Sequence, residues 1–134
     1  KVGLRGRVTA MHDVTEGGLL GALFEIADSS GNGIRIYEEN IHVDNYIDNV
    51  CSLFGIDPLK AISEGALLIT VREDFAQHLI SALKEEGIEA SIIGEITDNR
   101  GERILTGKEK RLIGPPEKDP FWAAVEYGMK KGWR

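Results

Sequence analysis

A run of polar residues followed by two glycines, near the start of the chain, has the residue types best suited to chemistry. Gly17 and Gly18 directly follow the run His12-Asp13-Val14-Thr15-Glu16. Glycines in the first turn of a helix leave backbone amides accessible, and the positive end of the helix dipole lies beside them. Because such a helix start binds anions, most often phosphate, the sequence predicts an anion site at the amides of Gly17 and Gly18.

The residues after the glycines predict the helix that would carry this site. Leu19, Leu23 and Ile26 recur at helical spacing, and a second apolar row beside them indicates a helix buried on more than one side. Thr15 is suited to be the N-cap, because its hydroxyl can accept a hydrogen bond from an amide of the first turn. Each glycine weakens a helix by about 1 kcal/mol relative to alanine, so the pair indicates a need for accessible backbone.

A purely structural interpretation accounts for the same residues. Gly17 and Gly21 are four positions apart, so they lie on one helix face and could let another segment pack closely there. Asp13 and Thr15 could be ordinary capping residues, and His12 could be a structural histidine. Composition alone does not choose between the two interpretations.

An ordered set of motifs extends from about residue 8 to about residue 107. The first motif is His-Asp-x-Thr-x-Gly-Gly leading into Leu-x-x-Ala-Leu-x-Glu-Ile-Ala. Four further pieces follow: Gly33-Ile34-Arg35-Ile36, Leu53-Phe54-Gly55-Ile56-Asp57-Pro58-Leu59, Ser63-Glu64-Gly65-Ala66-Leu67-Leu68 and Ile92-Ile93-Gly94-Glu95-Ile96. Each piece is unspecific alone, whereas their order is specific. In that order they resemble the C-terminal domain of the aminoimidazole ribonucleotide synthetase (AIR synthase) superfamily, and within it the HypE-like branch is the best match.

The resemblance implies a fragment of an ATP-dependent enzyme. In the superfamily this domain works with an N-terminal domain that carries most of the nucleotide and metal ligands, and the aspartate-rich ATP motifs do not occur in this sequence. We therefore expect ATP and Mg²⁺ to act in a full-length protein, none to be bound by this domain alone, and the isolated chain to be inactive. The implied partners are its own N-terminal ATP-binding domain, a second copy in a full-length homodimer, and a small-molecule substrate.

The resemblance also assigns roles to individual residues. Asp13 and Glu64 are the implied catalytic carboxylates, on two loops that border one cleft facing the ATP-binding domain. The implied phosphate or substrate contacts are His12, Thr15, Gly17 and Gly18. The resemblance implies no metal ligand in this domain.

Two features depart from the HypE-like pattern. Glu16 stands where many HypE proteins have arginine, and the chain ends Gly132-Trp133-Arg134 without the terminal cysteine that accepts a carbamoyl group in HypE. The leading hypothesis is therefore a HypE-like, AIR synthase-related enzyme whose glycine-rich loop contributes to a phosphate or substrate site. A true HypE hydrogenase maturation factor, which dehydrates the carbamoyl group, and a non-catalytic ligand-binding or interaction module remain alternatives.

Composition excludes several other classes of protein. The net charge of −6 and the lack of a basic stripe argue against a nucleic-acid surface. Cys51 is the single cysteine, so there is no disulfide framework, and a reducing cytoplasmic location is the simplest inference. His42 and His78 lack metal-ligand spacing. No apolar run is long enough to cross a membrane, so we expect no membrane partner.

The remaining pattern predicts a mixed β-sheet packed with helices, an α/β or α+β fold like the C-terminal domain of AIR synthase (PurM). The predicted elements are a turn at 29–33, a strand at 34–37, a helix at 46–54, a central strand at 66–71, a helix at 73–86, a buried strand at 90–96, a hairpin partner at 103–106 and a terminal helix at 119–131. We expect one domain over residues 1–134, with 115–134 as a C-terminal helical extension.

Overall fold

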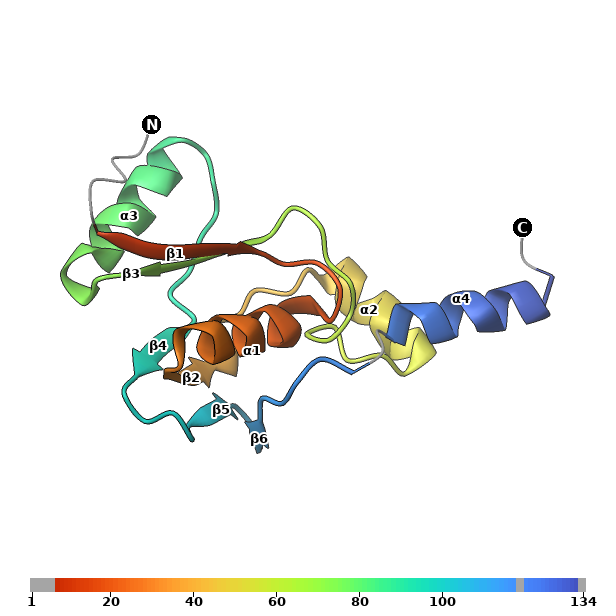
Figure 1. Cartoon of the computed structure of the whole chain (residues 1–134). Coiled ribbons are helices and arrows are strands. Elements are labelled where there is room, and N and C mark those ends of the chain that lie inside the picture. The colour runs from red at the N-terminus through yellow and green to blue at the C-terminus, as the bar shows by residue number, and fades with distance from the viewer. Residues whose placement is uncertain (1–6, 118–119, 133–134) are drawn as a thin grey trace.

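The chain forms a two-stranded ribbon and a four-stranded sheet with helices packed around them (Figure 1). The computed structural model describes residues 7–117 and 120–132. In chain order the elements are β1 (Val8–Asp13), α1 (Gly18–Ser30), β2 (Gly33–Tyr37), the 3-10 turn η1 (Glu38–Asn40), α2 (Asn45–Phe54), β3 (Leu67–Val71), α3 (Glu73–Glu85), β4 (Gly94–Thr97), β5 (Arg103–Thr106), β6 (Lys110–Leu112) and α4 (Pro120–Lys130). This mixture of helices and mixed strands confirms the predicted fold class.

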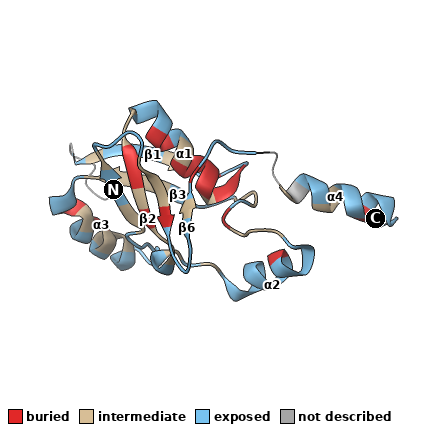
Figure 2. Cartoon of the chain, turned by 90° about the horizontal axis from the view of Figure 1, so that it is seen from below, coloured by how far each residue is buried: buried red, intermediate tan, exposed pale blue. Residues whose placement is uncertain are grey.

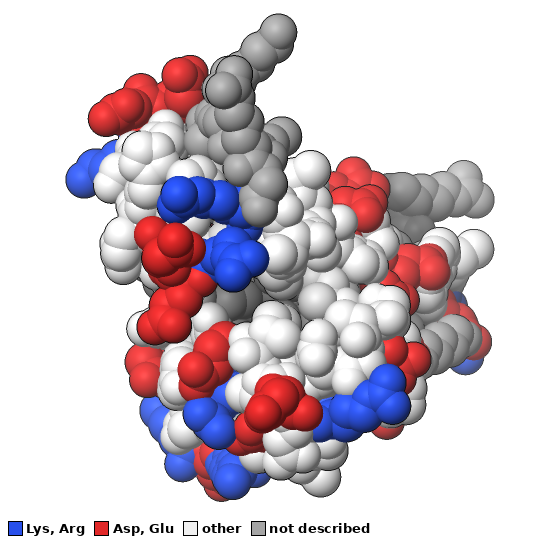
Figure 3. Space-filling view, turned by 60° about the vertical axis from the view of Figure 1, so that its left-hand side comes forward, with Lys and Arg blue, Asp and Glu red and all other residues white. Residues whose placement is uncertain are grey.

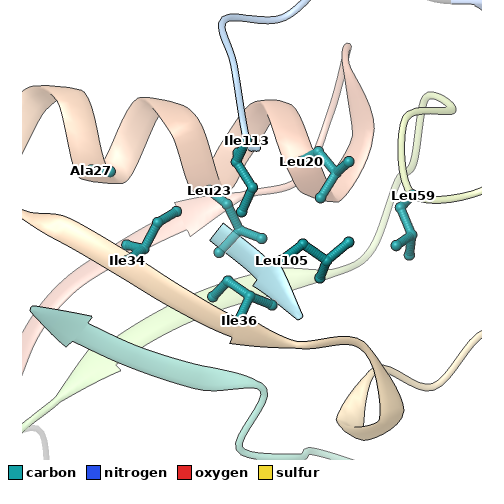
Figure 4. Close-up of a cluster of buried hydrophobic side chains, with 8 residues drawn as sticks. All are labelled: Leu20, Leu23, Ala27, Ile34, Ile36, Leu59, Leu105 and Ile113. Carbon is teal, nitrogen blue, oxygen red and sulfur yellow. The ribbon is translucent and has the colours of Figure 1, made fainter. Parts of the chain in front are cut away.

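Helix α1 lies between the β1–β3 ribbon and the four-stranded sheet, and the core forms around it (Figures 1 and 4). Buried apolar side chains from α1, β2, β5 and the connecting segments make one cluster: Leu20, Leu23, Ala27, Ile34, Ile36, Leu59, Leu105 and Ile113. Leu68 of β3 packs against the same cluster. The prediction that this helix is buried on more than one side is therefore confirmed.

Strand β2 lies between β4 and β5 in the four-stranded sheet, whose order is β4-β2-β5-β6. It is antiparallel to β4 and parallel to β5, and β6 pairs antiparallel with β5. The predicted hairpin ending at 103–106 is therefore wrong, because a strand from 60 residues earlier in the chain takes the position between its two arms. Local turn residues cannot reveal such a long-range insertion.

Strand β3 is not the central strand that its apolar sequence predicted. Among the described residues it pairs only with β1, and Leu67 at its start is 55% exposed. The predicted buried strand at 90–96 is also shorter and more exposed, since β4 spans only Gly94–Thr97 and Ile96 is exposed. An apolar run identifies a strand but does not distinguish the centre of a sheet from its edge.

Helices α2 and α4 lie at the periphery, and most of their surface is exposed (Figure 2). Helix α2 ends at Gly55, as predicted, and α4 lies within the predicted C-terminal extension.

The core predicts a sharp difference between two leucines of neighbouring strands. Leu105 is fully buried, whereas Leu112 is 81% exposed. Leu105→Ala should lower the free energy of unfolding by about 2–5 kcal/mol, because it leaves a cavity in the cluster. Leu112→Ala is the matched control and should change it by less than about 0.5 kcal/mol. Chemical denaturation of both variants measures the difference, and equal losses would contradict this assignment of the core.

Candidate functional site

Two loops meet where β1 ends and β3 begins. We name them the motif loop (residues 13–17) and the Glu64 loop (residues 59–66). The Val14 amide donates to the Ala66 carbonyl at 3.0 Å, and the Ser63 amide donates to the Thr15 carbonyl at 3.3 Å. Asp13 is also the residue paired with Leu67 in the ribbon. Backbone hydrogen bonds thus join two segments that the sequence analysis singled out separately.

The polar side chains of these loops face solvent. Asp13, Thr15 and Glu64 are all exposed, and the side chain of Asp13 is 80% accessible. Glu16 is exposed as well, so the motif loop carries two carboxylates beside the predicted anion site. The candidate catalytic residues therefore lie on exposed segments at the same end of the ribbon.

Gly18 makes a backbone contact that no other residue could make in this conformation. Its φ angle is +62°, and a Cβ atom placed there would lie 2.5 Å from the Ala61 carbonyl oxygen and 2.8 Å from that of Leu59. Two residues later, the Leu20 amide donates to the Leu59 carbonyl at 3.0 Å. The first turn of α1 therefore lies directly on the backbone of the Glu64 loop.

The glycine amides are less accessible than the sequence predicted. Both Gly17 and Gly18 are buried, and the Gly18 amide donates to the Thr15 carbonyl at 3.1 Å. The predicted N-cap role of Thr15 is wrong, because Gly17 in the left-handed region is the N-cap and no side chain caps the helix. In this arrangement the Gly18 amide donates its hydrogen bond within the turn, so it is not available to bind an anion.

A segment near the C-terminus covers the same helix start. The Cβ atom of Pro116 lies 3.0 Å from where a Cβ on Gly17 would be, and 3.5 Å from the equivalent position on Gly21. This contact matches the alternative in which Gly17 and Gly21 permit close packing. The glycines therefore shape the helix start on two sides, toward Pro116 and toward the Glu64 loop.

His12 connects β1 to α1. Its Nε2 lies 2.9 Å from Glu25 Oε2, and its Nδ1 lies 2.5 Å from the Asp13 carbonyl oxygen. The ring is therefore oriented by a partner that the sequence analysis missed. No local spacing rule relates a strand residue to a residue two turns into the next helix, so only the fold reveals Glu25.

Arg111 of β6 fixes the chain just before the Glu64 loop. Its guanidinium bonds Asp57 Oδ2 at 2.7 Å and Glu38 Oε1 at 3.1 Å, and Asp57 Oδ1 accepts a hydrogen bond from the Leu59 amide at 3.0 Å. This ion pair is partly buried, where such contacts are less screened than on the surface. It ties the start of the loop to the four-stranded sheet.

A second arginine cluster lies on the four-stranded sheet. Arg35 bonds Glu102 through Nε at 2.9 Å and through its second terminal nitrogen at 2.6 Å, and it bonds Glu95 at 2.7 Å. The hydrogen bonds from Arg35 lower the pKa of Glu102, and the same contacts, with that to Tyr37, raise the pKa of Arg35. These paired charges cross-link β2 with its neighbours, so a structural role accounts for them.

The other reactive groups show no site of their own. Burial raises the pKa of the Cys51 thiol, and Asp48 and Asp57 raise it further, which disfavours the reactive thiolate. Among the described residues, no group of three or more His, Cys, Asp or Glu side chains is placed to hold a metal ion. No described helix is long and apolar enough to cross a membrane. Acidic and basic side chains are interspersed on the face shown in Figure 3.

Comparison with known proteins gives consistent findings. The family model described as AIR synthase related protein, C-terminal domain, matches residues 1–106. A Methanocaldococcus jannaschii protein named for hydrogenase expression and formation is 35% identical over 118 residues, which cover 86% of this chain and 35% of that protein. Carbamoyl dehydratase HypE of Escherichia coli is 34% identical over 118 residues, which cover 85% of this chain and 35% of HypE.

The solved structures agree with the sequence relatives. The hydrogenase maturation protein HypE in complex with ATP matches with a TM-score of 0.78 at 28% identity, over 90% of this chain and 39% of that one. The chain thus spans about a third of the length of the curated relatives it matches.

The backbone contact at Gly18 predicts a specific loss of stability. Gly18→Ala adds a Cβ atom against the carbonyls of residues 59–61 at a positive φ angle. Gly55→Ala is the matched control, because Gly55 has a φ of +66° and nothing within 4 Å of an added Cβ. The control should cost about 1–2 kcal/mol from backbone strain alone, and Gly18→Ala should cost at least about 2 kcal/mol more. Thermal and chemical unfolding test this, and equal costs would mean that the helix start does not rest on the Glu64 loop.

Proposed function

Because the chain belongs to the AIR synthase related protein family, whose C-terminal domain it matches over residues 1–106, we propose that it forms the substrate-facing part of an ATP-dependent, HypE-like enzyme. The observation that carries this proposal is the hydrogen-bonded junction of the motif loop with the Glu64 loop. It brings the backbone segments that carry Asp13 and Glu64, both exposed, to the same end of the β1–β3 ribbon. The family resemblance and the adjacency of the two loops both support this proposal.

The chemistry of the relatives defines what these carboxylates could do. A carbamoyl dehydratase removes the oxygen of a carboxamide together with its two N–H protons, so the reaction needs groups that accept protons. Asp13 and Glu64 are suited to that role, because carboxylates are common general bases and both are exposed. The Thr15 hydroxyl, also exposed, would donate a hydrogen bond to a phosphate or to the substrate.

The remaining motif residues would act on the shape of the site. His12 contacts the Asp13 carbonyl and would orient the backbone that presents the Asp13 carboxylate. Gly17 and Gly18 would set the path of the motif loop, with Gly18 resting on the Glu64 loop. Since the Gly18 amide is bonded to Thr15, a bound phosphate would contact the loop through Thr15 unless the turn opens. Glu16 would repel the same phosphate, so its carboxylate would have to point away from it.

ATP and Mg²⁺ would be supplied by the rest of a longer protein. When bound, they would activate the carboxamide oxygen by phosphorylation, so that it leaves as phosphate. Support comes from the HypE–ATP complex among the similar structures, of which this chain spans 39%. The proposed partners are an N-terminal ATP-binding domain, a second full-length copy and a small-molecule substrate, in the cytoplasm.

A second candidate is a true HypE maturation factor for hydrogenase, which is favoured by the identity of 34% with Escherichia coli HypE. It differs from the first in requiring a cysteine that accepts the carbamoyl group. Mass spectrometry of the full-length protein, incubated with ATP and a carbamoyl donor, distinguishes the two. A carbamoyl or cyano adduct on a cysteine supports the second candidate.

The first test replaces Glu64 by glutamine in the full-length protein. Turnover should fall at least about tenfold through the loss of a general base, while the unfolding free energy changes by less than about 0.5 kcal/mol, because the side chain is exposed. Glu89→Gln, an exposed carboxylate outside both loops, is the control and should leave both quantities unchanged. A lower melting temperature with unchanged kinetics would show a structural role instead. Unchanged kinetics and stability would show that Glu64 takes no part in the reaction, and no turnover by the wild-type protein would favour a non-catalytic module.

The second test uses the 134-residue chain alone. We expect no Mg²⁺-dependent ATP hydrolysis, because the aspartate-rich ATP motifs of the superfamily do not occur in the sequence. Release of inorganic phosphate above the rate without protein would contradict the assignment of ATP binding to another domain.

A further inference from the structure

Glu25 belongs to the first motif of the chain, but the proposed function gives it no role. It lies about two turns into α1, and its carboxylate is 51% accessible. Its Oε2 lies 2.9 Å from Nε2 of His12 on β1. Successive side chains of a strand point to opposite faces. Met11 and Asp13 are exposed and His12 is half-buried, so His12 is the side chain of these three that is directed at α1.

The His12 ring connects Glu25 to the peptide group between Asp13 and Val14. Its Nδ1 lies within hydrogen-bonding distance of the Asp13 carbonyl oxygen. The N–H of the same peptide group is that of Val14, and it donates to the Ala66 carbonyl at 3.0 Å. Because a peptide group is planar, the two bonds hold it from both sides. A continuous chain of hydrogen bonds therefore runs from α1 through the ring and this peptide group to the Glu64 loop.

The two contacts of the ring make it a bridge between two acceptors. A carbonyl oxygen and an ionised carboxylate only accept hydrogen bonds, so the ring spans both when both of its nitrogens carry hydrogen. At the centre of the chain Val14 is buried, with 3% of its surface exposed. The Asp13 side chain, in contrast, is 80% accessible. Its position therefore depends mainly on the backbone that carries it.

We propose that Glu25 is a positioning residue for the reaction of this site. Through His12 it fixes the plane of the peptide group after Asp13, and this plane sets where the Asp13 carboxylate lies relative to the Glu64 loop. The inference rests on the proposed function for the chemistry at Asp13. The positioning itself belongs to this chain and can be measured without turnover.

Hydrogen exchange in the 134-residue chain, followed by NMR, tests the positioning. Glu25→Ala should speed exchange of the Val14 amide at least about threefold relative to the core amide of Leu105, because the peptide group is then held from one side only. Asp28→Ala is the matched control, since it removes another exposed carboxylate of α1, paired with Arg103 at 2.9 Å. It should leave the relative exchange of Val14 unchanged. Glu25→Gln should stay within about twofold of wild type, because an amide side chain can bond the ring in either protonation state.

Turnover of the full-length protein tests the link to the reaction. Glu25→Ala should lower kcat at least about tenfold with little change in KM, because a small displacement of a reacting group is costly. Glu25→Gln should restore most of this loss, and Asp28→Ala should cause none. His12→Ala should lower kcat as well. Adding Glu25→Ala to it should have little further effect, as expected for two residues that act through one contact.

Each measurement has an outcome that overturns the proposal. Unchanged Val14 exchange in Glu25→Ala, or equal acceleration in Asp28→Ala, would show that Glu25 does not hold the motif loop. Faster exchange with unchanged kcat would show that the loop position does not matter for the reaction. Additive losses in the double variant would show that Glu25 does not act through His12. No turnover by the wild-type protein would overturn the proposed function instead, and the exchange rates would still decide whether Glu25 positions the loop.

Discussion

The contact between the first turn of α1 and the backbone of residues 59–61 is the constraint on which the candidate site depends. Gly18 lies so close to the Ala61 carbonyl that a Cβ atom would be 2.5 Å from it, and the Leu20 amide bonds the Leu59 carbonyl. Only glycine satisfies both the positive φ angle and this approach. The contact holds the motif loop, which carries Asp13, against the Glu64 loop.

Other interactions fix the two loops from the outside. Arg111 joins Asp57 to Glu38, so the segment before the Glu64 loop is anchored to the four-stranded sheet. His12 and Glu25 join β1 to α1 next to Asp13. Leu59 contributes to the buried core. The candidate site thus consists of exposed side chains on a backbone that is held by core packing and by partly exposed ion pairs.

The sequence predicts the elements better than their arrangement. Helical spacing in Leu19, Leu23 and Ile26 identified α1 and its burial, and the apolar run from residue 66 identified β3. Local sequence patterns could not predict the strand order. Strand β2 lies between β4 and β5 in the sheet, and both of these strands are far from it in the sequence. In addition, an apolar strand at the edge of a sheet and one at its centre have the same sequence pattern.

The candidate site, like the fold, could be predicted only in part from the sequence. The loops that carry Asp13, Thr15 and Glu64 were identified from motif resemblance, and their adjacency is observed as backbone hydrogen bonds. The cap at Thr15 and the open amide at Gly18 were not found, because the left-handed conformation of Gly17 turns the chain before the helix begins. Glu25 and Pro116 contact the motif only in three dimensions, so no spacing in the sequence could indicate them.

The most direct measurement is a crystal structure of the full-length protein with Mg²⁺, a non-hydrolysable ATP analogue and a carboxamide substrate. We expect the carboxylates of Asp13 and Glu64 both to lie within hydrogen-bonding distance of the substrate, with Thr15 beside the transferred phosphate. A substrate bound elsewhere, with Asp13 and Glu64 both facing solvent, would contradict the central claim that the two loops form one site.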